Sequence, residues 1–106
     1  MLFGKEEEYI ELEHEGEEVK KLGRIPIQVE QMNDYADSDR IQKKLRDGSI
    51  LLVKIKSLRE KDLNELKRAI ARIRRTCEAM NGDIAAAGDD WLIITPPVAR
   101  ISRMGE

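Results

Sequence analysis

The stretch GDIAAAGDDWLIITPP, at residues 82–97, constrains the fold most because it specifies two adjacent strands and the turn between them. Glycine and aspartate suit a tight turn, so residues 88–90 are expected to join a strand DIAAAG to a strand WLIIT. Two prolines then end the pairing, since proline has no N–H to donate. The sequence therefore predicts an antiparallel hairpin, and with it a sheet.

The first strand of this hairpin is unusual because it consists largely of alanine, whereas strands favour branched and aromatic residues. Small side chains at Ala85, Ala86 and Ala87 permit close approach of another backbone or of a partner's side chains. Trp91 is a large side chain of the kind enriched at interfaces. Alternatively, the alanines make room beneath a helix and Trp91 lies in the core.

A long helix is predicted from residue 57 to about residue 80. Ser57 and Glu60 have the spacing of a capping box, in which each side chain satisfies an unpaired N–H. Apolar residues then recur every three or four positions and form one stripe, namely Leu63, Leu66, Ile70, Ile73, Cys77 and Met80. Such a stripe indicates packing against a sheet. The same spacing also suits a helix–helix dimer contact, which would involve Ile73 and Cys77.

The remaining elements precede this helix. The sequence predicts a strand at residues 25–30 and a helix within NDYADSDRIQKKLRDG, capped by Asp34 or Asp37 and ended by Gly48. A strand at residues 49–56 follows, in which ILLV is apolar on both faces. A short last strand is expected at VARIS, residues 98–102. The order β-α-β-α-β-β, with this optional final strand, predicts a two-layer α/β sandwich with its helices on one sheet face.

The first 24 residues are predicted to be an arm, separate from a core domain at residues 25–106. Eight glutamates face only four basic residues in the arm, a net charge of about −4 by counting formal charges. Such a segment does not bury enough surface to fold alone. It is either a solubilising tail or a segment that becomes helical on a membrane or partner. Its apolar residues are Met1, Leu2, Phe3, Tyr9, Ile10 and Leu12.

Several classes of protein are excluded or disfavoured. No apolar run reaches the length of a membrane span, and the N-terminus lacks the features of a signal peptide, so the protein is expected in the cytoplasm. A single cysteine excludes an internal disulfide and a cysteine-cluster zinc site. His14 is the only histidine, and the turn explains Asp89 and Asp90. No catalytic residue, metal site or cofactor is therefore predicted.

Binding of nucleic acid is the second hypothesis. The order of elements resembles small nucleic-acid-binding folds of the Alba and translation-initiation-factor type. The long helix also carries Lys67, Arg68, Arg72, Arg74 and Arg75. However, the net charge is −2 and only 4% of residues are aromatic, so the chain offers little to phosphates or to stacked bases.

Two stretches, DYADSDRIQKKLRDGSILLVKIKSL and GDIAAAGDDWLIITPPVARI, resemble the SepF family of cell-division proteins, in its archaeal form. The matching features are an aspartate-rich helix start, a Leu-x-x-Gly helix end, an apolar strand, Gly-x-Ile, and a later Gly-Asp before an apolar run and Thr-Pro. The matching residues are Asp37, Ile41, Leu45, Gly48, Ile50 to Val53, Gly82, Ile84, Gly88, Asp89, Leu92, Thr95 and Pro96. The likeness covers residues 34–101.

This resemblance implies a homodimer that binds the C-terminal tail of the tubulin-like protein FtsZ and tethers FtsZ polymers to the inner face of the cell membrane at the division site. The dimer contact is expected at the three alanines or at Ile73 and Cys77. The arm, through its six apolar residues, would bind lipid. The residues assigned to the FtsZ tail are Lys54, Asp90, Trp91, Leu92, Ile94 and Arg100.

Overall fold

A computed structural model of the chain describes residues 23–105. One sheet has the strand order β1-β2-β4-β3. Its strands are β1 (Ile27–Gln31), β2 (Ile50–Lys54), β3 (Asp83–Ala87) and β4 (Trp91–Thr95). β1 runs parallel to β2, while β4 is antiparallel to both β2 and β3. The hairpin predicted from residues 82–97 is therefore confirmed.

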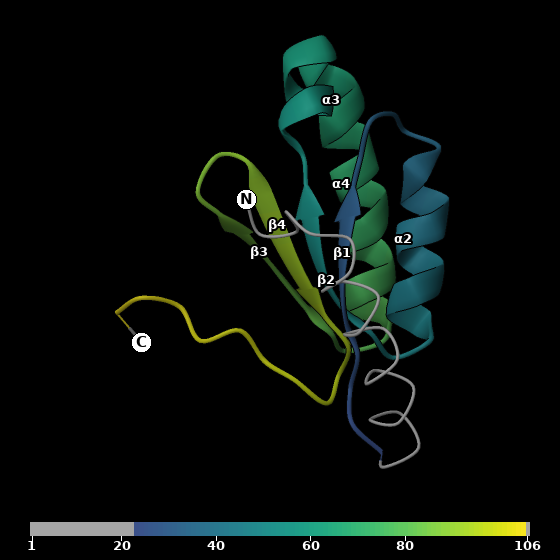
Figure 1. Ribbon diagram of the computed structural model, residues 1–106, viewed down its shortest axis with the longest axis vertical. Coiled ribbons are helices and arrows are strands. Elements are labelled where there is room, and N and C mark those ends of the chain that lie inside the picture. The colour runs from purple at the N-terminus through teal and green to yellow at the C-terminus, as the bar shows by residue number, and fades with distance from the viewer. Residues whose placement is uncertain (1–22, 106) are drawn as a thin grey trace, which may run out of the picture.

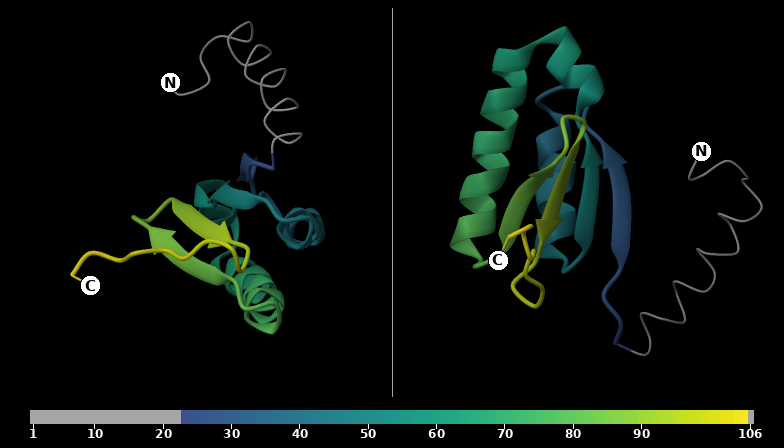
Figure 2. Two further views of the ribbon diagram at one scale, coloured as in Figure 1. Left: turned by 90° about the horizontal axis from the view of Figure 1, so that it is seen from below. Right: turned by 90° about the vertical axis from the view of Figure 1, so that its left-hand side faces the viewer.

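Two helices, α2 (Asp37–Arg46) and α4 (Leu63–Ala79), lie side by side on one face of the sheet, as Figures 1 and 2 show. The short helix α3 (Lys56–Lys61) packs on α4 at one end of the sheet. This arrangement confirms the α/β sandwich with its helices on one sheet face. Within residues 23–105, no helix covers the opposite face of the sheet.

The core lies between the helices and the sheet. Because successive side chains of a strand point to opposite faces, alternate residues of β2 and β4 point toward the helices. These residues meet the apolar sides of α2 and α4, and the cluster is almost completely buried. Its main members are Ile41, Leu45, Leu51, Val53, Leu66, Ala69, Ile73, Cys77, Leu92 and Ile94.

The predicted long helix is broken in two. Asp62 separates α3 from α4, and its side chain accepts a hydrogen bond from the backbone N–H of Glu65, so that Asp62 caps α4. The capping box expected at Ser57 and Glu60 is not formed, because α3 begins one residue before Ser57. The Ser57 hydroxyl instead accepts a hydrogen bond from Gln31 Nε2 at 3.1 Å.

Other helix ends agree more closely with the sequence. Gly48 follows the end of α2 with a φ of 98°, as expected. The N-cap of α2 is Ala36 and not Asp34 or Asp37, although Asp34 Oδ1 accepts the backbone N–H of Asp37, the first residue of the helix. At the end of α4 the left-handed residue is Asn81, with a φ of 60°, rather than Gly82. Glycine at position 82 lets the backbone pass close to Thr95, because a Cβ there would lie 2.3 Å from the carbonyl oxygen of Thr95.

The expected last strand at residues 98–102 is not present. Residues 96–103, here called the strap, run without regular structure past the end of β4. The carboxylate of Asp83 accepts the backbone N–H of Ile101 at 2.9 Å, and Thr95 Oγ1 donates to the carbonyl oxygen of Ala99 at 3.0 Å. The backbone N–H of Ile101 and the carbonyl oxygen of Ala99 are therefore hydrogen-bonded to side chains and not to a neighbouring strand.

Because most of the apolar stripe packs in the core, substitutions along it should differ in their effect on stability. Ile73 is fully buried, whereas Leu63, at the start of the same stripe, is 48% exposed. We expect Ile73→Ala to lower the free energy of unfolding by about 2–5 kcal/mol, because it removes buried methyl groups and leaves a cavity. Leu63→Ala should change it by about 0.5 kcal/mol or less. Urea denaturation followed by circular dichroism measures both, and equal effects would contradict this packing.

Candidate functional site

The face of the sheet opposite the helices is here called the open face. The strand register places Val29, Leu52 and Ile93 side by side across β1, β2 and β4. Ala87 lies opposite Trp91 in the pairing of β3 with β4. Ile27 and Val29 are 63% and 36% exposed, so apolar side chains meet solvent here.

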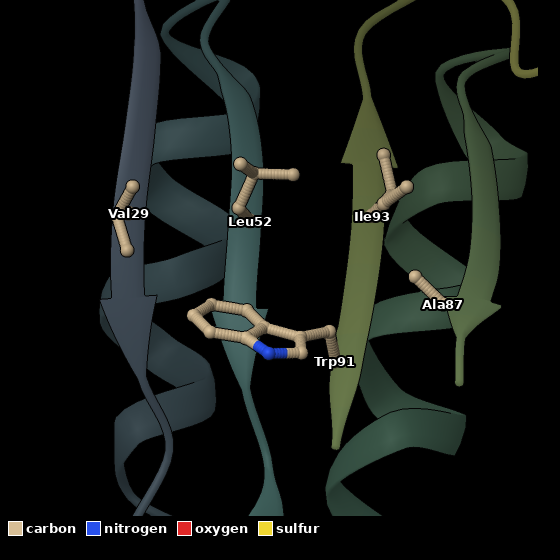
Figure 3. Close-up of a pocket in the computed structure, with 5 residues that line it drawn as sticks. All are labelled: Val29, Leu52, Ala87, Trp91 and Ile93. Atoms are coloured by element: carbon tan, nitrogen blue, oxygen red, sulfur yellow. The ribbon is translucent and has the colours of Figure 1, made fainter. Parts of the chain in front are cut away.

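A hollow of about 220 Å³ lies on the open face. All of its lining side chains are apolar: Val29, Leu52, Ala87, Trp91 and Ile93. Figure 3 shows the indole of Trp91 extending from β4 across β2 toward the strand that carries Val29. The hollow is the candidate site of this protein, because contiguous apolar surface on soluble domains is often a surface of interaction.

Two polar side chains of β1, those of Gln28 and Glu30, face the helices. Gln28 donates to Ser49 Oγ at 2.7 Å, and Glu30 forms ion pairs with Arg40, at 2.8 Å, and with Lys44. Burial alone would raise the pKa of the Glu30 carboxyl. Hydrogen bonds from Lys44 and Arg40 outweigh that effect and lower the pKa below its ordinary value. Gln28 and Glu30 are thus satisfied on the helix side, and the alternation of the strand places Ile27, Val29 and Gln31 on the open face.

The hairpin turn is attached to the helix layer. Asp90 forms an ion pair with Arg59 at 2.7 Å, and its carbonyl oxygen accepts the backbone N–H of Ile55 at 2.8 Å. These contacts hold the beginning of β4, and therefore Trp91, in a fixed position. Lys54 is exposed and lies opposite Trp91 in the sheet, so a positive charge borders this end of the hollow.

Two residues assigned to the tail site require correction. Leu92 and Ile94 are 4% and 0% exposed and belong to the core, because the alternation of β4 turns them toward the helices. Ile93 is the residue of β4 that lies beside Trp91 on the open face. Arg100 and Lys54 lie at opposite ends of β4, since Arg100 follows the strand and Lys54 pairs with its first residue.

The residues expected at a dimer contact are also divided. Ile73 and Cys77 are buried against the sheet, and burial raises the pKa of the Cys77 thiol. They offer no surface to a second copy. Ala85 and Ala87 lie on the open face, whereas Ala86 points to the helix side at the exposed edge of the sheet.

Sequence reasoning missed three residues that line the hollow, namely Val29, Leu52 and Ile93. A signal for Val29 was present, because Ile27 and Val29 of β1 alternate with the polar Gln28 and Glu30. This alternation fixes which side chains share a face. It did not show that the apolar face points away from the helices.

The basic residues of α4 are partly occupied within the helix layer. Arg72 forms an ion pair with Asp39 at 2.6 Å and donates to Ser38 Oγ. The guanidinium groups of Arg68 and Arg72 each lie 5.5 Å from the centre of the Tyr35 ring. These contacts give Arg68 and Arg72, two of the five basic residues, a structural role between α4 and the segment that leads into α2.

The pKa of Asp83 depends on its hydrogen bonds to the strap, so its titration reports whether the strap is in place. Hydrogen bonds from Arg103, and then from the backbone of Ile101, lower the pKa of Asp83 to about 2. The folded pKa lies below the unfolded one, so this stabilisation is present above pH of about 4 and is lost as the pH falls toward 2. We expect Asp83→Asn to reduce the loss of stability in this range, measured by thermal unfolding. An unchanged pH profile would contradict the assignment.

Metal-binding clusters and membrane-spanning helices were also sought among residues 23–105. In the described part of the chain, no three side chains of the metal-binding types gather into a site. No helix there is both long and apolar enough to cross a membrane. The apolar arm residues assigned to lipid, Met1 to Phe3, Tyr9, Ile10 and Leu12, lie outside the described residues.

The fold is similar to that of two solved archaeal structures. A SepF-like protein from Archaeoglobus fulgidus has a TM-score of 0.71 and 26% sequence identity, over 77% of this chain and 98% of that one. A SepF-like protein from Pyrococcus furiosus has a TM-score of 0.65 and 25% identity, over 74% and 95% of the two chains. No curated protein sequence matches the chain.

The family model "Cell division protein SepF" matches residues 27–101, from the first residue of β1 into the strap. This range contains the four-stranded sheet, the helices α2, α3 and α4, and every residue that lines the hollow. Sequence and structure thus agree, and the chain belongs to the SepF family of cell-division proteins.

Proposed function

We propose that this protein is a non-enzymatic adaptor that binds the C-terminal tail of FtsZ and tethers FtsZ polymers to the cytoplasmic membrane. The observation that carries the proposal is the apolar open face around Trp91, in a chain of a cell-division family. A surface of this kind supports binding of a polypeptide. The family match favours this role over the nucleic-acid hypothesis.

The first part of the proposal is a homodimer formed through the open face. Ile27 and Val29, on the edge strand β1, present apolar surface that a second copy would cover. Two copies related by a two-fold axis place the same patch on both sides of such a contact. The ion pairs of Glu30 with Arg40 and Lys44 leave the helix side of β1 already satisfied, which favours the open face as the contact.

The FtsZ tail is proposed to dock at the hairpin end of the open face. Trp91 and Ile93 would supply apolar contact, and Lys54 would attract an acidic residue of the tail. The turn that precedes Trp91 is held by the ion pair between Asp90 and Arg59. The indole is therefore positioned before a partner arrives, which reduces the cost of ordering on binding.

The arm is proposed to attach the complex to the membrane on the cytoplasmic side. Anionic lipid attracts basic segments and repels acidic ones, so the glutamates of the arm oppose binding. One arm alone should therefore bind weakly. Two arms on a dimer, and many along an FtsZ polymer, raise the avidity without new contacts.

A pull-down with purified FtsZ tests the proposal. Full-length FtsZ should be retained by this protein, and FtsZ lacking its C-terminal tail should not. Equal retention of the two forms would place the contact outside the tail. Retention of neither form would remove FtsZ as the partner.

The proposed dimer gives a separate prediction. Val29→Glu places a charge on the open face, and it should convert the dimer to a monomer because burying an unpaired charge is costly. Ala71→Glu, on the exposed side of α4, is a control with the same change of charge and should leave the mass unchanged. Sedimentation velocity measures both variants, and circular dichroism verifies folding. A Val29→Glu protein that is folded and still dimeric would contradict contact through the open face.

A further inference from the structure

The outer edge of β3 is capped by side chains of the same chain. β3 is one of the two edge strands of the sheet. The backbone N–H of Ile84 donates to Asp83 Oδ1 at 2.9 Å. The carbonyl oxygen of Ile84 accepts a hydrogen bond from Arg103 Nη2 at 3.0 Å. Both backbone groups of Ile84 therefore point away from β4. Since the direction alternates along a strand, the backbone groups of Ala86 also point outward.

Asp83 and Arg103 form a clamp that holds the strap at this edge. Arg103 Nη2 lies 3.0 Å from Asp83 Oδ1, while Asp83 Oδ2 accepts the backbone N–H of Ile101 at 2.9 Å. Thr95 Oγ1 fixes the beginning of the strap through the carbonyl oxygen of Ala99. The guanidinium of Arg103 reaches Ile84 because the strap is held in this way.

Beyond the clamp, the edge of β3 is suited to pairing with another strand. The strand ends in Ala85, Ala86 and Ala87, whose small side chains let a second backbone approach closely. An exposed strand with outward backbone groups is a template for strand addition. An antiparallel pair of two β3 strands centred on Ala85 would place Ile84 of one copy opposite Ala86 of the other. That pairing requires the two backbone groups of Ile84 that the clamp occupies.

We propose that the Asp83–Arg103 clamp closes the edge of β3 against pairing with β3 of a second copy, and that opening the clamp turns two-copy association into extended assembly. The edge-pairing part of the proposal is argued from the outward direction of the backbone N–H and C=O of Ile84, which Asp83 and Arg103 now occupy. The growth beyond two copies rests on the proposed dimer, because each copy then carries two self-complementary surfaces. The open face and the edge of β3 are different surfaces, so a pair formed through one leaves the other available.

Arg103→Ala tests the proposal in the full chain, with Arg74→Ala on the exposed side of α4 as the control for loss of one positive charge. We expect the Arg103→Ala protein to form species larger than the unaltered protein, with a mass that rises with concentration. Arg74→Ala should match the unaltered protein. Light scattering coupled to size exclusion measures the masses, and circular dichroism verifies that each variant is folded.

A second substitution identifies the edge as the contact. Ala86→Pro removes an outward N–H, which the sheet itself does not use, and in combination with Arg103→Ala it should restore the original mass. If that protein does not fold, Ala86→Glu, which places like charges at the paired edges, replaces it. Larger species that persist with either substitution would overturn the proposal, as would an Arg103→Ala protein of unchanged mass.

Hydrogen exchange separates this proposal from the proposed dimer. In the assembled Arg103→Ala protein, the amide of Ala86 should exchange at least about tenfold more slowly than in the unaltered protein. If the open-face dimer is absent, Arg103→Ala should stop at a pair of copies that still protects this amide. Assembly without protection of Ala86 would overturn edge pairing and leave the open-face dimer unaffected.

Discussion

Trp91→Ala is expected to weaken binding of the FtsZ tail by more than tenfold. The indole lies across β2 over the hollow, and its position is fixed by the neighbouring contacts of Asp90. Truncation of an aromatic anchor at the centre of an interface often costs about 2 kcal/mol or more. Calorimetry with a tail peptide measures the affinity, and sedimentation should show that the dimer persists.

Leu63→Ala is the matched control, because Leu63 is an exposed apolar residue at the start of α4, a helix that packs on the sheet face opposite the open face. Its affinity for the tail should equal that of the unaltered protein. Trp91→Phe keeps an aromatic ring and should retain part of the binding. An unchanged affinity in Trp91→Ala would remove Trp91 from the tail site.

Deletion of residues 1–12 is expected to abolish recruitment of FtsZ to liposomes. Full burial of a large apolar side chain contributes roughly 1.5–3 kcal/mol, so Leu2 and Phe3 give only a weak attachment in each arm. Recruitment then depends on many arms acting together along a polymer. Co-sedimentation of FtsZ with liposomes measures the effect, and the unaltered protein without FtsZ should bind lipid feebly.

The shortened protein should still bind FtsZ in solution, which separates loss of the membrane contact from loss of the adaptor. A variant with Leu2 and Phe3 replaced by serine keeps the length and charge of the arm and should behave like the deletion. If the shortened protein still brings FtsZ to lipid, the membrane contact lies on the folded domain, and the arm is a solubilising tail.

The elements of this fold are predictable from local patterns. The acidic turn and the prolines define the hairpin, and the three- and four-residue spacing in residues 63–80 defines the face of α4 that packs on the sheet. These signals depend on residues close together in sequence. The break at Asp62 was missed because the cap there competes with the equally plausible capping residue Ser57, which instead bonds to Gln31 across the fold.

The site is less predictable because it depends on tertiary arrangement. An apolar run such as WLIIT does not state which of its alternate residues face the helices, so Leu92 and Ile94 were assigned to a surface from which they are excluded. The strap depends on a contact between Asp83 and Arg103, which are 20 residues apart in sequence. No local sequence pattern predicts an ion pair between residues that far apart in the chain.

Because the apolar side of β1 faces outward, the stability of the protein depends on which molecules cover that surface. Ile27 and Val29 lie in solvent, so part of the hydrophobic surface of the domain is not buried by its own helices. Any molecule that covers this surface binds the folded state and raises its stability by mass action, by about 2.7 kcal/mol when its free concentration is 100 times the dissociation constant. The melting temperature should consequently rise with protein concentration if a second copy is that molecule, and a dilute sample should unfold more readily than a concentrated one.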